Sequence, residues 1–82
     1  MICTVKIEKQ LSNMRSAEYV LNVEENRGES ICSVEITMCG DREYAYDICR
    51  DVSRAREFLW SLADGEVEPC HLKDIVYDLL PL

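Results

Sequence analysis

The spacing of apolar residues changes once along this chain, and that change most constrains its fold. Up to Cys49, apolar side chains recur at every second position, which is typical of strands with one buried face. From Asp51 onward they recur three or four residues apart, which is typical of amphipathic helices. The pattern predicts strands at about 2–8, 17–25, 30–38 and 43–49, and helices at about 51–64 and 69–80.

Short turns join the predicted strands. Two turns are predicted, each between two alternating segments: Asn26-Arg27-Gly28-Glu29 and Cys39-Gly40-Asp41-Arg42. Gly28 in the first turn is free to adopt a positive φ. Strands joined by such tight turns pair antiparallel. The predicted fold class is therefore α+β, an antiparallel three- to four-stranded β-meander with two C-terminal helices packed on one face. Alternation leaves open whether the segment 2–8 pairs with the sheet as its fourth strand.

Alternation also assigns side chains to the two faces of the sheet. In the last strand, Tyr44, Tyr46 and Ile48 are expected to share one face. The inward row of the other strands is expected to comprise Cys3, Val5, Ile7, Tyr19, Leu21, Val23, Cys32, Val34, Ile36 and Met38.

Start and stop signals bracket both predicted helices. Asp51 stands where an acid favours a helix N-terminus, and Gly65 stands where a glycine at the C′ position ends a helix. Pro69 suits the first position of the second helix. We expect the two apolar stripes to lie side by side across the buried face of the sheet. The stripes comprise Val52, Ala55, Phe58, Leu59 and Leu62 in the first helix, and Leu72, Ile75, Val76, Leu79 and Leu80 in the second.

Composition indicates one globular domain and argues against several kinds of partner. The chain has 82 residues, 48% of them hydrophobic and 30% charged, which fits a single domain spanning 1–82. Nine basic and 16 acidic residues give a net charge of −7, opposite in sign to the footprint of a nucleic-acid binder. No segment resembles a signal peptide, and no apolar run approaches the roughly 20 residues of a membrane span. We expect a cytoplasmic protein that binds neither nucleic acid nor membrane.

The five cysteines are expected to be reduced thiols, because their number is odd and their spacing is irregular. Several of them are expected to act as small hydrophobic side chains in the core. A secreted disulfide scaffold has an even set. A structural zinc site needs four N or S ligands, usually in closely spaced pairs, and the chain has no CxxC. The three glycines stand singly, so none of them builds a phosphate cradle. We expect no metal and no cofactor.

The C-terminal part of the chain carries a recognisable run. Asp47-Ile48 leads into a charged helix, Gly65 ends that helix, and the stretch from Pro69 to Asp78 reads PCHLKDIVYD, which fits the pattern PxHLxDIVxD. In these features the chain resembles a family of short bacterial proteins from Firmicutes, classed as a domain of unknown function. The resemblance covers most of the chain and implies a small α+β protein, but it implies no activity. The family has a serine before the proline, where this chain has Glu68.

The only histidine lies beside a cysteine in this run. Cys70 and His71 would occupy the first turn of the second helix, where the helix field favours a thiolate, and Asp74 would be within reach of either. Adjacent residues of an α-helix point about 100° apart, so Cys70 and His71 are expected to diverge. We therefore expect no catalytic residue here, and a polar cluster of His71 and Asp74 at the helix start.

The predicted surface offers a different candidate. Trp60 and Tyr77 fall off the apolar stripes of their helices, and Arg56 lies one turn before Trp60. These residue types dominate binding hot spots. The leading hypothesis is a non-enzymatic cytosolic interaction module that binds a protein partner or itself through Arg56, Trp60 and Tyr77, or through an edge strand. Packing of Trp60 against the neighbouring helix, or its coverage by Arg56, remains open.

The alternative function belongs to another class, a thiol-reactive or redox-sensing protein that uses Cys70 or the turn residue Cys39. Such a protein needs an exposed thiolate.

Overall fold

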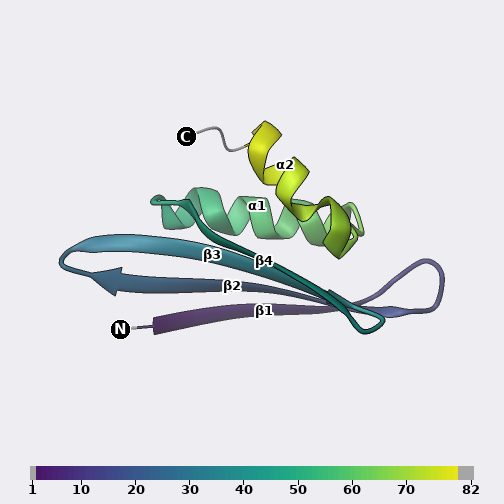
Figure 1. Cartoon of the computed structure of the whole chain (residues 1–82). Helices are drawn as coiled ribbons and strands as arrows, with labels where there is room; N and C mark the ends of the chain where they lie inside the picture. The colour runs from purple at the N-terminus through teal and green to yellow at the C-terminus, as the bar shows by residue number, and fades with distance from the viewer. Residues whose placement is uncertain (1, 80–82) are drawn as a thin grey trace.

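Four strands form one antiparallel sheet in chain order, and two helices follow them (Figure 1). The computed structural model describes residues 2–79. The strands are β1 (Ile2–Gln10), β2 (Ser16–Asn26), β3 (Glu29–Met38) and β4 (Asp41–Cys49). The helical elements are α1 (Val52–Asp64), the short 3-10 helix η1 (Pro69–His71) and α2 (Leu72–Leu79). The predicted α+β architecture is confirmed.

The N-terminal segment is a full member of the sheet. β1 pairs with β2 along its whole length, from Ile2 opposite Glu24 to Gln10 opposite Ser16. The sheet therefore has four strands, with β1 and β4 at its edges. The inner row of β1 is only partly covered, and Cys3 at its beginning is exposed.

Both predicted turns have the backbone that a two-residue hairpin connection requires. Arg27 and Gly28 have φ values of 55° and 80°, and Cys39 and Gly40 have values of 50° and 87°. Positive φ at both central positions matches the right-handed twist of the flanking strands. The second turn thereby holds the Cys39 thiol at the exposed tip of a hairpin.

The core lies between the sheet and α1, which crosses β2, β3 and β4 on one face (Figure 1). The predicted inward rows of β2 and β3 are buried, and so is the predicted stripe of α1 except for the half-buried Val52. Leu11, in the connection between β1 and β2, closes one end of this core. The residues with no exposed surface are Tyr19, Leu21, Cys32, Val34, Ile36, Ala55, Leu59 and Leu72.

α2 lies on the same face but covers less of it. It contacts β4, and Figure 1 shows it rising at a steep angle from α1 instead of running beside it. Leu72 is completely buried, whereas Ile75 and Val76 are half-buried. The predicted stripe residue Leu80 and the side chain of Leu79 lie outside the described part of the chain.

The prediction that Tyr44, Tyr46 and Ile48 share one face is wrong. Ala45 and Ile48 are buried, whereas Tyr44 is 42% and Tyr46 60% exposed. The two tyrosine rings lie near each other, with centroids 6.4 Å apart. The inward positions of β4 are therefore three residues apart, which strict alternation does not allow.

A β-bulge causes this change. The pairing of β3 with β4 shifts register between Cys32 and Val34, and Asp47 in the bulged part of β4 has a φ of 55°. The Asp47 N–H donates to the hydroxyl of Ser33 at 3.2 Å, and Ser33 is only 3% exposed. Three residues of β4 lie opposite one of β3 between the pairs Val34–Ala45 and Cys32–Cys49, so two of them are extra. A residue outside the ladder needs another acceptor for its N–H. The Ser33 hydroxyl supplies that acceptor.

One end of α1 agrees with the prediction and the other differs by one residue. Asp51 caps the N-terminus, because its carboxylate accepts the Arg54 N–H at 3.3 Å. Gly65 has a right-handed φ of −83°, and Glu66 takes the left-handed conformation with a φ of 51°. Glycine suits position 65 for a steric reason and not for a positive φ, because a Cβ at this position would lie 3.3 Å from the Ser61 carbonyl oxygen.

Candidate functional site

The segment between α1 and α2 is fixed to the core at several points. The Val67 N–H donates to the Leu62 carbonyl at 3.1 Å, and the Val67 carbonyl accepts the Tyr19 hydroxyl at 3.2 Å. Pro69 and Leu72 are buried, and η1 contacts β3 and β4. The backbone of this connection therefore has a defined position relative to the sheet.

Three donor side chains gather on the outer surface of this segment. Potential ligand atoms of Glu68, Cys70 and His71 all lie within 4.8 Å of one another, and we call these residues the three-donor cluster. The Cys70 thiol lies 3.8 Å from a Glu68 carboxylate oxygen. All three side chains are exposed. The cluster thus combines sulfur, nitrogen and oxygen donors at an open surface.

The expected divergence of Cys70 and His71 is wrong, because their ligand atoms lie within 4.8 Å of each other. Adjacent residues of a 3-10 turn point about 120° apart, so these two side chains meet through their own rotamers and not through the backbone rotation. The His71 N–H donates to the Glu68 carbonyl at 3.0 Å in this turn, and Glu68 itself is extended. The carboxylate that joins the cluster is therefore that of Glu68, which precedes the turn. Asp74, expected beside His71, is exposed and does not belong to the cluster.

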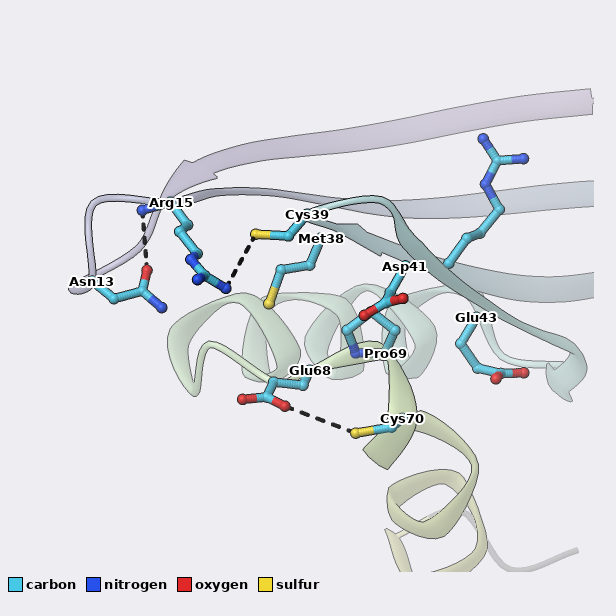
Figure 2. A pocket seen from close by; sticks show the side chains of 10 residues that line it. Asn13, Arg15, Met38, Cys39, Asp41, Glu43, Glu68, Pro69 and Cys70 are labelled. Atoms are coloured by element: carbon cyan, nitrogen blue, oxygen red, sulfur yellow. Dashed lines mark hydrogen bonds between the residues drawn. The ribbon is translucent and has the colours of Figure 1, made fainter.

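An open pocket of about 360 Å³ lies beside the cluster (Figure 2). It is formed by the connection between β1 and β2, the hairpin turn between β3 and β4, and the beginning of η1. Both predicted reactive thiols, Cys39 and Cys70, line it. Its complete lining is Asn13, Arg15, Met38, Cys39, Asp41, Arg42, Glu43, Glu68, Pro69 and Cys70.

The two thiols have different neighbours within this pocket. The Arg15 guanidinium lies 3.8 Å from the Cys39 sulfur, whereas Cys70 faces Glu68 on the opposite side (Figure 2). Cys39 therefore lies beside a cation, and Cys70 beside a carboxylate. Both residues can be singled out from the sequence, but not their place in one pocket, because their proximity arises from the packing of η1 against β3 and β4.

Glu66 links the connection to the loop after β1. One carboxylate oxygen accepts the Ser12 hydroxyl at 2.5 Å, and the other accepts the Ser12 backbone N–H at 2.8 Å. These hydrogen bonds to Ser12, together with the nearby Lys9 ammonium, hold the pKa of Glu66 below its usual value. Lys9 also donates to the Ala63 carbonyl at 2.7 Å, near the C-terminus of α1. Both contacts fix the end of α1 that leads into the three-donor cluster.

The predicted interaction residues are all on the surface. Trp60 is 56% and Tyr77 85% exposed, and Arg56 is exposed as well. Within residues 2–79, Arg56 forms no ion pair. The exposed pair Tyr44 and Tyr46 was not predicted from the sequence, because the bulge that turns these side chains outward depends on a contact between strands.

The cysteines differ widely in environment. All five are free thiols. Cys32 is completely buried, and desolvation raises the pKa of its thiol, as do the neighbouring Cys49 thiol and nearby carboxylates. Cys3, Cys39 and Cys70 are exposed. The expectation that several cysteines fill the core therefore applies fully to Cys32 alone.

Comparisons of this chain with family models, curated proteins and solved structures gave no match. The resemblance to the Firmicutes family therefore remains a prediction. None of the helices within residues 2–79 combines the length and the apolar character needed to cross a membrane.

Proposed function

We propose that this protein is a small non-enzymatic interaction module of the cytosol that binds another protein through Arg56, Trp60 and Tyr77, here called the docking surface. The observation that carries this proposal is the exposure of Trp60, which keeps 56% of its surface in contact with solvent. A large aromatic side chain left in water gains free energy when a partner covers it. Trp and Arg are also the residue types enriched at binding hot spots.

Charge indicates the chemistry of the partner. Residues 51–79, which contain both helices, carry seven acidic and three basic residues, a net charge of −4 out of −7 for the chain. The acidic positions on the helices include Glu57, Asp64, Asp74 and Asp78, all of them exposed. Complementary charge favours a partner of opposite sign and accelerates encounter. We therefore propose a basic protein surface with a pocket that accepts the Trp60 ring.

The test compares capture of partners by wild type and by Trp60→Ala from native cytosol, followed by affinity measurement with the purified captured protein. Removal of a hot-spot tryptophan costs 2 kcal/mol or more, so we expect binding to weaken by about 30-fold. Met14→Ala is the matched control, since Met14 is 79% exposed but lies in the loop after β1. Its affinity should equal that of wild type, and the affinity of wild type should fall as salt is added.

Three results would contradict the proposal. Trp60→Ala could bind the captured protein as tightly as Met14→Ala does. Trp60→Ala could instead lower the free energy of unfolding by about 3–5 kcal/mol, as removal of a core tryptophan does. Light scattering could also show that wild type forms a dimer that Trp60→Ala abolishes, in which case the occupant of the docking surface is a second copy and not a basic partner.

A second candidate function is thiol chemistry at Cys39 or Cys70, and the observation in its favour is that both thiols line one pocket. The Arg15 guanidinium lies 3.8 Å from the Cys39 sulfur, and cationic neighbours are found beside reactive cysteines. Alkylation rates measured against pH, with each cysteine followed by mass spectrometry, test this candidate. A midpoint at the free-cysteine value of about 8.5 for every accessible thiol would rule it out.

A further inference from the structure

We propose that Glu68, Cys70 and His71 form an open three-ligand site for a borderline divalent cation of the Zn²⁺ class. This proposal uses none of the residues of the docking surface, so it stands or falls separately from the proposed function. It replaces the expectation of no metal, which rested on the lack of paired cysteines in the sequence. The site is built from three different donors in four consecutive residues. A search for CxxC spacing, which finds paired cysteines, does not detect such an arrangement.

The spacing of the donor atoms fits such an ion. With a Zn–S distance of about 2.3 Å and a Zn–O distance of about 2.1 Å, tetrahedral geometry places the sulfur and oxygen about 3.6 Å apart. The Cys70 sulfur and the Glu68 carboxylate oxygen are 3.8 Å apart. The His71 ligand nitrogen lies within 4.8 Å of both, so small side-chain rotations bring all three donors to one ion.

The backbone that carries the donors is already in place. Val67 before the cluster is hydrogen-bonded to the core on both its N–H and its carbonyl, and Leu72 after it is completely buried. Buried Pro69 lies between the donors and fixes the local backbone. The entropic cost of binding is therefore limited to three side chains. A fixed supporting structure of this kind distinguishes a site from a chance meeting of flexible surface residues.

The chemistry of the three donors also determines which metal ions the site prefers. A thiolate and an imidazole bind Zn²⁺ and its neighbours in the first transition row, whereas Mg²⁺ and Ca²⁺ prefer sites made of oxygen alone. Within residues 2–79, none of the three donors forms an ion pair, and the nearby Lys73 ammonium is engaged by Glu43 at 3.3 Å. Three protein ligands leave the fourth position open. Because the cluster is exposed, water fills that position and the ion can exchange.

Titration of the reduced, chelator-treated full-length protein with Co²⁺ tests the site. We expect one equivalent to bind with an absorption band from charge transfer between the Cys70 thiolate and Co²⁺, and Zn²⁺ to displace it while Mg²⁺ does not. Cys70→Ser, His71→Asn and Glu68→Gln should each weaken Zn²⁺ binding at least about tenfold, since loss of outer partners alone costs 10–100-fold. Cys39→Ser and Asp74→Asn are matched controls and should bind as wild type.

A second measurement needs no variant. Zn²⁺ should slow the alkylation of Cys70 in wild type while leaving Cys3 and Cys39 unchanged, as followed by mass spectrometry of each peptide. The proposal is overturned if Cys39→Ser loses as much affinity as Cys70→Ser, because the ion then lies elsewhere in the pocket. It is also overturned if His71→Asn binds as tightly as wild type, or if Co²⁺ binds without the charge-transfer band.

Discussion

The hydroxyl group of Tyr19 allows a quantitative test of how the connection between the helices is anchored. Tyr19 has no exposed surface, and its hydroxyl donates to the Val67 carbonyl at 3.2 Å. Tyr19→Phe keeps the ring in the core and removes only this donor. A net hydrogen bond contributes about 0.5–1.5 kcal/mol, and a partly buried carbonyl left without its partner adds a penalty. The bond is at the long end of the usual range, so we expect a loss of about 1 kcal/mol.

Urea denaturation and thermal unfolding followed by circular dichroism measure this loss. A change of 1 kcal/mol corresponds to a fall in melting temperature of about 4–8 °C for a domain of this size. Tyr46→Phe is the matched control, because it makes the same chemical change at a side chain that is 60% exposed. Its stability should stay within about 0.5 kcal/mol of wild type. If Tyr19→Phe destabilises the protein no more than Tyr46→Phe does, the Tyr19 hydroxyl does not anchor the connection.

Tyr19 also makes the stability of the protein depend on pH. Burial raises the pKa of Tyr19 above the ordinary value of a tyrosine, with a smaller contribution from the charge of Glu66. A group whose pKa is raised in the folded state contributes stability that is fully present below its unfolded pKa and is lost as pH rises through the folded one. Wild type should therefore lose stability relative to Tyr19→Phe only above pH of about 10. Equal losses in both proteins would contradict this.

Three further perturbations test other contacts. Ser33→Ala leaves the bulge N–H of β4 without an acceptor and should cost about 1–3 kcal/mol in urea denaturation, with Ser30→Ala as the control. Lys9→Met removes the donor to the Ala63 carbonyl at the end of α1 and should cost about 1–2 kcal/mol, less at high salt. Glu66→Gln tests the effect of Ser12 on the pKa of Glu66, which is lowered in the folded protein. A carboxyl group with a lowered pKa contributes stability above its unfolded pKa, and this stability is lost as pH falls through the folded pKa. The difference in stability between wild type and Glu66→Gln should therefore be largest near neutral pH and disappear in acid.

The strands and turns could be predicted because their signals are local. Alternation over Cys32 to Met38 needs no knowledge of the rest of the chain, and the two turns need only the residues that tolerate positive φ. The helix start at Asp51 is equally local. For these reasons the number, order and direction of the elements follow from the sequence, and with them the fold class.

The bulge and the three-donor cluster could not be predicted, because both depend on contacts or angles that a regular pattern does not contain. The bulge needs the Ser33 hydroxyl across the sheet to accept the Asp47 N–H. The cluster joins Cys70 and His71 of a 3-10 turn to the extended Glu68 before it, whereas the sequence pattern predicts a regular α-helix from Pro69. The left-handed residue at the end of α1 is Glu66 and not Gly65, which the preference of glycine for positive φ does not predict.

The hairpin turn between β2 and β3 is a suitable place to add sequence to this protein. All four residues from Asn26 to Glu29 are exposed, and Figure 1 shows this end of the sheet extending beyond α1. The pocket lies at the other end of β3, next to Cys39. A longer loop that replaces Arg27 and Gly28 and carries an epitope or fluorescent label would leave both helices and the three-donor cluster unobstructed, because long surface loops cost little stability. Such a labelled protein could be followed in living cells with the docking surface and the pocket intact.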